Sequence, residues 1–413
     1  MKKALCFICL ALISLRCSAA VPAVVPSAVS SAVDAVVPEG AIRFIFDGHL
    51  YLQSTLNDTI PVTVIYDTGA DFLYLDEDYL EQTHLQDAFG RKAKARMGGA
   101  GDGKPVKIDV FVDPVKIQCG ALTYHNKMTP VIRLRDILGR YTDGLLGNTH
   151  LLNSALAVNF SERYIKQLDY PISSDLIDGY RRLDVRFVDN RIDVKAKVQI
   201  DPKTVVEGWF RMDFGCGSAV ILTNETASTL DLTPFPKAYF STQAGGVGGG
   251  SEEVSLRAER VTLLDSFENV VIDCSLNQEG ALSSDRPYLG IIGNEIWSLY
   301  DFVFDPSTAS VWVKRNNDAG TYSKASTTHM AVFDRTDICE GWVVNGLYRG
   351  GIAEKAGFEI GDIILSINDR SVKEISWEEQ RKGLGLNGET KYKVQKKDGR
   401  IVIYTLFIHD QII

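Results

Sequence analysis

The chain has 413 residues, of which 45% are hydrophobic and 23% charged, and its formal net charge is −9 at pH 7. This composition is that of a globular protein with a large core, and the length suggests two to four domains. The net acidity argues against nucleic acid and against an anionic membrane surface as partners.

The N-terminal segment has the pattern of a secretory signal peptide. Lys2-Lys3 gives a basic start, residues 4–15 form an apolar run too short to span a bilayer, and Ser18-Ala19-Ala20 supplies small residues for cleavage. We therefore predict that residues 1–20 are a signal peptide and that the protein is exported, to the periplasm or the extracellular space.

We expect the exported chain not to be anchored in a membrane. Lipidation at Cys17 is the less favoured alternative, because Arg16 is a poor residue before a lipidated cysteine. No later stretch is long and apolar enough for a transmembrane helix. Residues 21–40 consist mostly of Ala, Val, Pro and Ser, which is typical of a flexible leader.

The remaining cysteines and the histidines indicate neither disulfides nor metal binding. The four cysteines beyond the signal peptide are widely spaced and form no CxxC pair: Cys119, Cys216, Cys274 and Cys339. We therefore predict buried free thiols rather than a disulfide framework. The six histidines show no metal-ligand spacing, so we predict neither a zinc site nor a cofactor.

From residue 41 the sequence alternates short apolar runs with turn residues, which predicts strands. The expected strands of the first half lie at 42–46, 50–52 and 62–65, and those of the second half at 183–187, 192–198 and 205–210. Short helices are expected at 77–86, 133–138 and 227–232. We predict two β-rich lobes, residues 41–175 and 176–315.

The sequence changes character after Asn316. Residues 316–328 are polar and rich in Ser and Thr, which is typical of a linker, and residues 329–413 form a third module. Because of this linker, we expect the third module to be tethered rather than packed into the lobes.

One motif that carries an aspartate occurs twice. Asp67-Thr68-Gly69-Ala70 and Asp213-Phe214-Gly215-Cys216 each follow an apolar run. Each motif is followed by two aliphatic residues and a glycine, Leu145-Leu146-Gly147 and Ile291-Ile292-Gly293. The spacing is the same in both copies (147 − 67 and 293 − 213, both 80). This repeat suggests two carboxylates that meet across a pseudo-twofold axis.

A glycine-rich stretch lies inside each copy, between the aspartate motif and the aliphatic pair. The glycines of these stretches are Gly98, Gly99 and Gly101 in the first copy and Gly245, Gly246 and Gly248 in the second. Strand-like residues flank both stretches, which favours hairpin tips. Such tips can close over a bound peptide and exclude water.

Two aspartates held close together cannot both ionise, because like charges a few Å apart repel. One carboxylate can then act as base on a water while the other, protonated, polarises a carbonyl. The Thr68 hydroxyl can bond across to the partner copy, and the glycines permit a sharp turn. Such a pair suits hydrolysis of an amide without a metal or a covalent intermediate.

The order of strand, Asp-Thr-Gly, glycine-rich hairpin and hydrophobic-hydrophobic-Gly resembles the pepsin/retropepsin superfamily of aspartic peptidases, in its bacterial secreted branch. The resemblance covers residues 41–315. It implies that Asp67 and Asp213 are the catalytic dyad, supported by the flanking motif residues and by both aliphatic loops. It also implies that Gly98–Gly103 and Gly245–Gly250 are flaps that bind substrate.

The second motif departs from this family at Phe214, where the family has Thr or Ser. The change removes one hydroxyl from the hydrogen-bond pair between the copies. If only this bond matters, Phe214→Thr raises turnover or stability. If the ring is a packing residue around which the site is built, the same change is harmful, and we favour this second interpretation.

The third module carries its own motif. Gly350–Asn368 resembles the central motif of bacterial PDZ domains, with a short helix at 353–356 that ends at Gly357 and a strand at 363–367. A second helix is expected at 377–384 and a final hairpin from 392 to 407. Residues 383–386 resemble a carboxylate-binding loop, but we favour a helix terminus. Whether the module binds a protein C-terminus, an internal peptide or no free peptide stays open.

The sequence therefore predicts a mainly β protein: two pseudo-twofold-related, retropepsin-like lobes that form a cleft, followed by a small α+β PDZ domain. The predicted function is that of a secreted aspartic endopeptidase that cleaves peptide or protein substrates in extended conformation. Two alternatives are a non-catalytic peptide-binding protein with the same fold and a cell-envelope scaffold whose working part is the PDZ domain.

Overall fold

The computed structural model describes residues 37–148, 154–188, 190–284, 286–316, 328–381, 384, 386 and 388–408. All of them belong to one compact unit that begins at Val37. The predicted signal peptide, nearly all of the leader and residues 317–327 of the predicted linker lie outside the described residues. Strands predominate throughout, as the sequence predicts.

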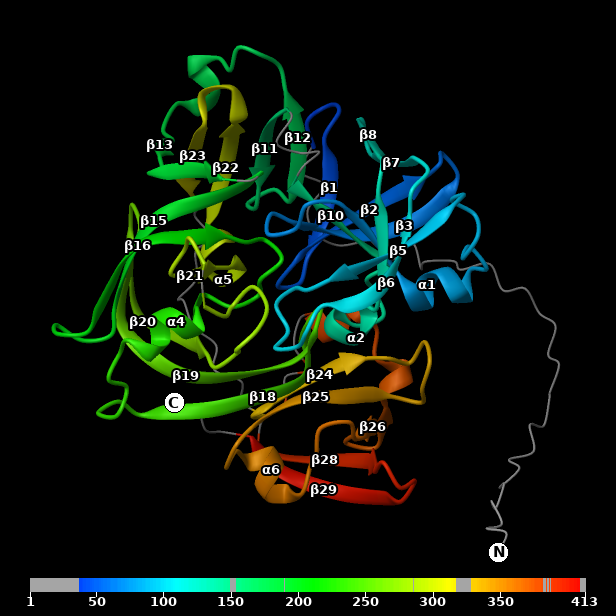
Figure 1. Cartoon of the computed structure of the whole chain (residues 1–413). Coiled ribbons are helices and arrows are strands. Elements are labelled where there is room, and N and C mark those ends of the chain that lie inside the picture. The colour runs from blue at the N-terminus through cyan, green and yellow to red at the C-terminus, as the bar shows by residue number, and fades with distance from the viewer. Residues whose placement is uncertain are drawn as a thin grey trace, which may run out of the picture. The chain divides into compact units, whose positions relative to one another are not determined.

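The first repeat, residues 42–168, is built almost entirely of short strands (Figure 1). Its elements are β1 (Ile42–Phe46), β2 (Leu50–Leu56), β3 (Ile60–Asp67), β4 (Leu73–Asp76), α1 (Glu77–Gln82), β5 (Lys92–Met97), β6 (Val106–Phe111), β7 (Val115–Cys119), β8 (Leu122–Asn126), β9 (Thr129–Ile132), α2 (Arg135–Leu138), β10 (Gly144–Gly147), β11 (Ala155–Asn159) and β12 (Tyr164–Leu168).

The second repeat, residues 181–315, follows after the short 3₁₀ turn η1 (Ser174–Ile177). Its elements are β13 (Arg181–Arg182), β14 (Val185–Val188), β15 (Arg191–Gln199), β16 (Val205–Met212), β17 (Val220–Leu222), α4 (Asn224–Ser228), β18 (Lys237–Gly246), β19 (Gly249–Thr262), β20 (Ser266–Ser275), β21 (Gly290–Ile292), α5 (Asn294–Trp297), β22 (Tyr300–Asp305), η2 (Pro306–Thr308) and β23 (Ser310–Arg315).

Both repeats insert the aliphatic strand beside the strand that carries the aspartate. In the first repeat β10 lies between β3, to which it is parallel, and β4, to which it is antiparallel. In the second repeat β21 lies in the same way between β16 and β17. The register places Gly147 opposite Asp67. The equal spacing in the sequence therefore corresponds to the same local topology in both repeats.

The two repeats are joined by a sheet around a pseudo-twofold axis. β11 pairs antiparallel with β22, and Ala157 lies opposite Val303. These residues are separated by 146 positions, the same offset that relates Asp67 to Asp213 (303 − 157 and 213 − 67). The strand order β13-β23-β22-β11-β12-β1 is balanced about this pair. Equivalent residues of the two repeats thus lie on opposite sides of one axis.

The C-terminal module, residues 330–408, has its own buried core. It consists of β24 (Met330–Asp334), β25 (Trp342–Tyr348), α6 (Ile352–Ala356), β26 (Ile363–Ile367), β27 (Arg370–Ser371), η3 (Val372–Glu374), α7 (Trp377–Arg381), β28 (Gly388–Gln395) and β29 (Ile401–Ile408). The helix α6 ends at Gly357 in a left-handed conformation with φ 105°, as the sequence predicts.

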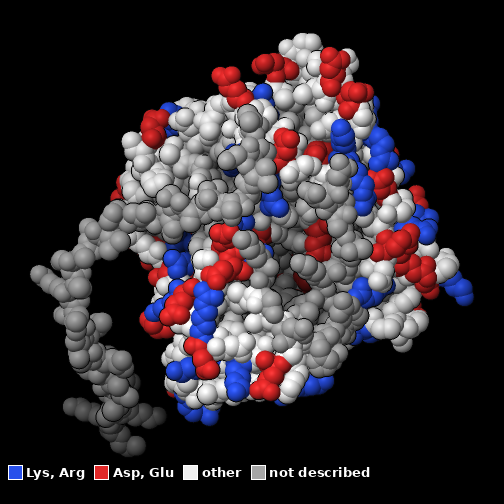
Figure 2. Space-filling model, turned by 180° about the vertical axis from the view of Figure 1, so that it is seen from behind, with Lys and Arg blue, Asp and Glu red and all other residues white. Residues whose placement is uncertain are grey.

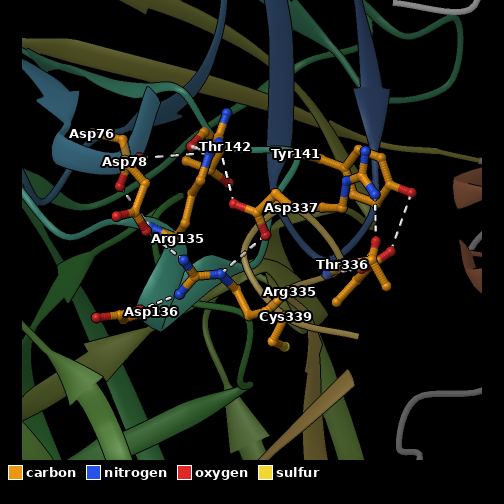
Figure 3. Close-up of polar contacts among 12 residues, drawn as sticks. Asp76, Asp78, Arg135, Asp136, Tyr141, Thr142, Arg335, Thr336, Asp337 and Cys339 are labelled. Atoms are coloured by element: carbon orange, nitrogen blue, oxygen red, sulfur yellow. Dashed lines mark hydrogen bonds and ion pairs between the residues drawn. The ribbon is translucent and has the colours of Figure 1, made fainter. Parts of the chain in front are cut away.

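The expectation that this module is only tethered is wrong, because it shares a sheet with the second repeat. β25 pairs antiparallel with β18, and the sheet continues through β26 and β28 to β29 (Figure 1). The module also contacts the first repeat through Arg335, whose guanidinium pairs with Asp78 and Asp136 (Figure 3). A polar linker sequence says nothing about docking contacts that form elsewhere in the chain.

Smaller expectations also need correction. The helix expected at 227–232 is α4, which begins at Asn224 because the Thr223 side chain accepts a hydrogen bond from the Thr226 N–H. The four cysteines are free, as predicted, but only two of them are buried, Cys119 and Cys274, whereas Cys216 and Cys339 are half-buried.

Candidate active site

The two aspartates lie in contact at the pseudo-twofold axis. A Cβ added to Gly69 would lie 2.6 Å from Asp213 Oδ2, and one added to Gly215 would lie 2.6 Å from Asp67 Oδ1. Each motif glycine therefore packs directly against the carboxyl group of the other repeat. Any side chain at Gly69 or Gly215 would displace the opposite carboxylate, which explains physically why both motifs have glycine at this position.

Backbone N–H groups hold each carboxylate in place. Asp67 Oδ1 accepts hydrogen bonds from the N–H groups of Gly69 (2.7 Å) and Ala70 (3.1 Å), and Asp213 Oδ1 accepts one from Gly215 (2.8 Å). Burial is the main cause that raises the pKa of Asp67 well above its usual range. The neighbouring Asp213 raises it further through its charge and a side-chain hydrogen bond. One proton shared between the two groups fits this electrostatic situation.

Thr68 ties the two motifs together from one side. Its buried hydroxyl donates to the Met212 carbonyl at 2.9 Å and accepts from the Phe214 N–H at 2.9 Å. Phe214 cannot return an equivalent hydroxyl bond. Its ring is instead fully buried, with edge contacts to four aromatic rings, those of Tyr66, Phe160, Phe302 and Phe304. The second repeat thus uses aromatic packing where the first uses a hydrogen bond.

The aliphatic loops lie beneath the motifs. Leu146 and Ile292 are fully buried, whereas Leu145 and Ile291 belong to two small apolar clusters that include Ala70 and Cys216, respectively. A Cβ on Gly147 would lie 2.7 Å from the Ala70 backbone, and one on Gly293 would lie 2.5 Å from the Cys216 carbonyl oxygen. Both glycines therefore let the aspartate loop pack directly on the aliphatic strand.

Two buried asparagines support these loops, and the sequence interpretation missed them. Asn148 and Asn294 follow the two loop glycines and lie at the same offset from the aspartates (148 − 67 and 294 − 213, both 81). Asn148 accepts a hydrogen bond from Tyr66, and Asn294 donates to the carbonyls of Gly48 and Phe214. Extending the repeat comparison by one residue would have found both.

Each motif glycine is also held by a side chain from the opposite repeat. Arg191 donates to the Gly69 carbonyl at 2.8 Å and pairs with Asp71 at 2.9 Å. His49 Nε2 lies 3.2 Å from the Gly215 carbonyl. Burial lowers the pKa of His49, so the neutral ring with its proton on Nε2 fits this contact. No spacing in the sequence points to these two residues.

The glycine-rich stretches form the tips of two hairpins, the first hairpin (β5 and β6) and the second hairpin (β18 and β19). Their tips meet: the Gly101 N–H donates to the Val247 carbonyl at 3.2 Å, and the Asp102 N–H donates to the Gly250 carbonyl at 2.8 Å. A Cβ on Gly99 would lie 2.8 Å from that of Val247.

The other tip glycines are also explained by close approach or by turn geometry. A Cβ on Gly246 would lie 2.7 Å from that of Ala100, one on Gly245 would lie 2.7 Å from Ser251 Cβ, and Gly248 has φ 114°. Gly98 has more space, since a Cβ there would reach only Pro105 at 3.7 Å. Two backbones can therefore lie directly against each other above the aspartates' loops.

The hairpin tips contact apolar walls next to both aspartate motifs. Met97 and Val247 pack on the cluster that contains Ala70 and Leu145. Ala100 packs on the cluster that contains Cys216 and Ile291. The first tip is held further by residues 277–281, because Ala281 donates to the Gly99 carbonyl at 2.7 Å. The structure thus brings all the sequence-predicted site residues into one region.

A second carboxyl pair lies on the second repeat, Glu253 on β19 and Asp273 on β20. Burial, with the neighbouring Asp273, raises the pKa of Glu253 to about 8. Ser255 donates a hydrogen bond to Asp273 at 2.6 Å.

A group of three or more His, Cys, Asp and Glu placed to bind a metal ion is not found among the described residues.

The C-terminal module matches a known family. A family model of the PDZ domain matches residues 343–381, from β25 to α7. The chain carries a PDZ domain. No curated protein matches the chain. The assignment of the aspartate motifs therefore rests on the sequence repeat and on the geometry.

The first repeat contacts the edge strand of the PDZ domain sheet, β24. PDZ domains take a peptide as an added strand at a sheet edge. Here the Arg140 N–H donates to the Asp334 carbonyl of β24 at 2.9 Å. The Tyr141 ring stacks on Trp377 of α7, with centroids 4.5 Å apart and an interplanar angle of 8°. Figure 3 shows Tyr141 beside Thr336 of the C-terminal module. Of the predicted carboxylate-like residues 383–386, only Leu384 and Leu386 are described.

The packing of Phe214 leads to a prediction for its replacement. We expect Phe214→Thr to lower the free energy of unfolding by about 3 kcal/mol or more, because the lost ring leaves a cavity. One regained hydroxyl bond offsets only about 0.5–1.5 kcal/mol. Urea unfolding measures the difference, with Phe214→Leu as a control that keeps most of the volume and loses less. A threonine variant as stable as the parent would contradict the packing role.

The raised pKa of Asp67 predicts a pH-dependent effect of Asp67→Asn on stability. The folded protein holds this proton more tightly than the unfolded chain, so its stability falls as pH rises from about 3.9 through the raised pKa. Asparagine does not ionise, so the Asp67→Asn variant does not lose stability in this way. Its free energy of unfolding relative to the parent should therefore increase between about pH 3.9 and the raised pKa of Asp67. Urea midpoints from pH 4 to 8 test this, with Asp169→Asn at an exposed position as control. A constant difference at all pH values would oppose it.

Proposed function

We propose that the protein is an aspartic-type endopeptidase, which hydrolyses peptide bonds with water activated by Asp67 and Asp213. The observation that carries this proposal is the contact of the two carboxyl groups, one with a raised pKa, beneath two glycine-rich hairpins. The repeated topology around β10 and β21 supports the resemblance of residues 41–315 to the pepsin/retropepsin superfamily. The two retropepsin-like lobes are part of the same proposal.

In the proposed mechanism, Asp67 carries the shared proton and Asp213 is the base. Asp213 takes a proton from a water whose oxygen attacks the carbonyl carbon, while Asp67 donates a hydrogen bond to the carbonyl oxygen. The tetrahedral intermediate then collapses with cleavage of the C–N bond, and the proton on Asp213 passes to the leaving amine. This route needs neither a covalent intermediate nor a cofactor.

The surroundings of the dyad favour a substrate in extended conformation. The hairpin tips lie against apolar clusters on both sides, those of Leu145 and of Ile291, which can take apolar side chains when the tips open. Opening and closing of the hairpins would admit substrate and exclude water. On the face in Figure 2, acidic and basic side chains are interspersed, which fits a peptide substrate better than nucleic acid.

Export remains part of the proposal and rests on the signal-like residues 1–20. In the part of the chain that the structure describes, no helix is long and apolar enough to cross a membrane. The proposed location is the periplasm or the extracellular space.

Cleavage of an unfolded protein substrate at acidic and neutral pH, with and without a pepstatin-type inhibitor, tests the activity. We expect the parent to cleave and Asp67→Asn and Asp213→Asn each to lose at least 1,000-fold, because the lone carboxyl cannot serve as both acid and base. Asn in place of the exposed Asp169 (Asp169→Asn) should keep full activity. Cleavage that survives both dyad substitutions would rule the mechanism out. Absence of cleavage by the parent would favour a peptide-binding protein that keeps the cleft.

A second candidate function is peptide binding by the PDZ domain, as in a cell-envelope scaffold. The domain match supports a role in protein interaction. The edge of β24 is partly covered by Arg140, and Tyr141 covers Trp377. A protein C-terminus or internal peptide would have to replace these contacts.

This occupancy predicts that Tyr141→Ala increases peptide binding by the full chain. We expect roughly a tenfold gain, the equivalent of losing one internal contact worth about 1.4 kcal/mol. Binding to an immobilised library of C-terminal and internal peptides measures the gain, and the exposed Tyr170→Ala serves as control. Equal binding by both variants would show that residues 139–141 do not block the edge.

A further inference from the structure

The PDZ domain is part of the same sheet as the second hairpin. Phe240, Ser241 and Thr242 of β18 pair with residues 346–348 of β25. This pairing lies on the side of β18 opposite to β19. A Cβ on Gly346 would lie 2.6 Å from the Phe240 ring, so glycine is needed for the two strands to approach this closely. The hairpin is therefore built against the domain along part of its length.

Asn345 continues this contact where the strand pairing stops. The register of β18 with β19 is irregular between Thr242 and Gly246. At this irregularity Asn345 Oδ1 accepts from the Ala244 N–H, and its Nδ2 donates to the Ala244 carbonyl, both at 3.0 Å. The asparagine is buried, with 4% exposure. Its amide thus binds both backbone groups of one hairpin residue, as a paired strand would.

The position of Ala244 matters for the tips. Ala244 lies three residues before Val247, whose carbonyl accepts the hydrogen bond from Gly101 of the first hairpin. Fixing the backbone of Ala244 therefore fixes the starting point of the tip that meets the first hairpin above the aspartates' loops.

The other side of the PDZ domain is anchored on the first repeat. Arg335, whose side chain is 4% exposed, pairs with Asp78 in α1 and with Asp136 in α2 (Figure 3). A second ion pair reverses the charges: Arg135 of the first repeat pairs with Asp337 of the C-terminal module at 3.1 Å. The domain is thus fixed to one repeat while it holds the hairpin of the other.

We propose that Asn345 is a positioning residue of the cleft, through which the PDZ domain holds the second hairpin over Asp67 and Asp213. The inference rests on the proposed peptidase function for its effect on catalysis. It assigns to the PDZ domain a role in completing the cleft itself. Loss of the amide leaves both Ala244 backbone groups without this partner and allows the tip to move.

Asn345→Ala is the decisive variant, with Asn368→Ala as matched control. Asn368 accepts a backbone hydrogen bond from Lys391 within the PDZ domain, where β26 pairs with β28, so its loss tests destabilisation of the domain alone. We expect Asn345→Ala to lower kcat/KM about tenfold or more on a short unstructured peptide, mainly through kcat. Asn368→Ala should leave kcat/KM unchanged at a temperature where both variants are folded. Asn345→Asp should not rescue, because it has no donor for the Ala244 carbonyl.

Amide hydrogen exchange provides a readout that does not depend on activity. Exchange at residues 244–248 should be at least tenfold faster in Asn345→Ala than in the parent and unchanged in Asn368→Ala. If the parent has no peptidase activity, the proposed function fails but this exchange experiment still decides the positioning role. Unchanged exchange and unchanged kcat/KM in folded Asn345→Ala would overturn the inference. So would equal effects of the two substitutions.

Discussion

The antiparallel pairing of β11 with β22 is the constraint on which the site depends. Because Ala157 lies opposite Val303, at the same offset as Asp67 and Asp213, the two repeats are related by one axis. An axis of this kind brings the same strand end of each repeat to the same place. The two carboxyl groups meet there, and neither repeat could form the pair alone. A buried pair of acids is costly, so the surrounding loops must hold it.

The two repeats share one backbone topology, but different side chains hold their aspartate loops. Thr68 reaches across with a hydroxyl, whereas Phe214 contributes a ring to an aromatic core. Arg191 and His49 each hold a motif glycine from the opposite repeat, but with different chemistry. The motif glycines, the loop glycines and the two asparagines after the aliphatic loops keep the symmetry of the repeat. Different side chains can serve one geometry because the backbone topology already fixes where the loops lie.

The C-terminal module joins the two repeats from a third side. It pairs with β18 and is anchored through Arg335, so it contacts both repeats at once. Breaking a buried ion pair leaves a charge without compensation, which makes such an anchor hard to release. The edge of β24, where a PDZ domain would take a peptide, is partly covered by Arg140, which bonds to the last residue of the strand. The domain therefore contacts the second hairpin through β25 and the first repeat through β24.

The sequence by itself determined the strands, the two aspartate motifs, the aliphatic loops with equal spacing, and the PDZ motif with its helix ending at Gly357. These features are local or repeat at a fixed distance, so periodicity and turn chemistry reveal them. The tertiary structure alone decided the contacts of Arg191 and His49, the burial of the Phe214 ring, and the docking of the PDZ domain on both repeats. These contacts join residues that lie far apart in the sequence, through surface shape and charge. Such complementarity arises only when the chain has folded, and it leaves no regular pattern along the sequence.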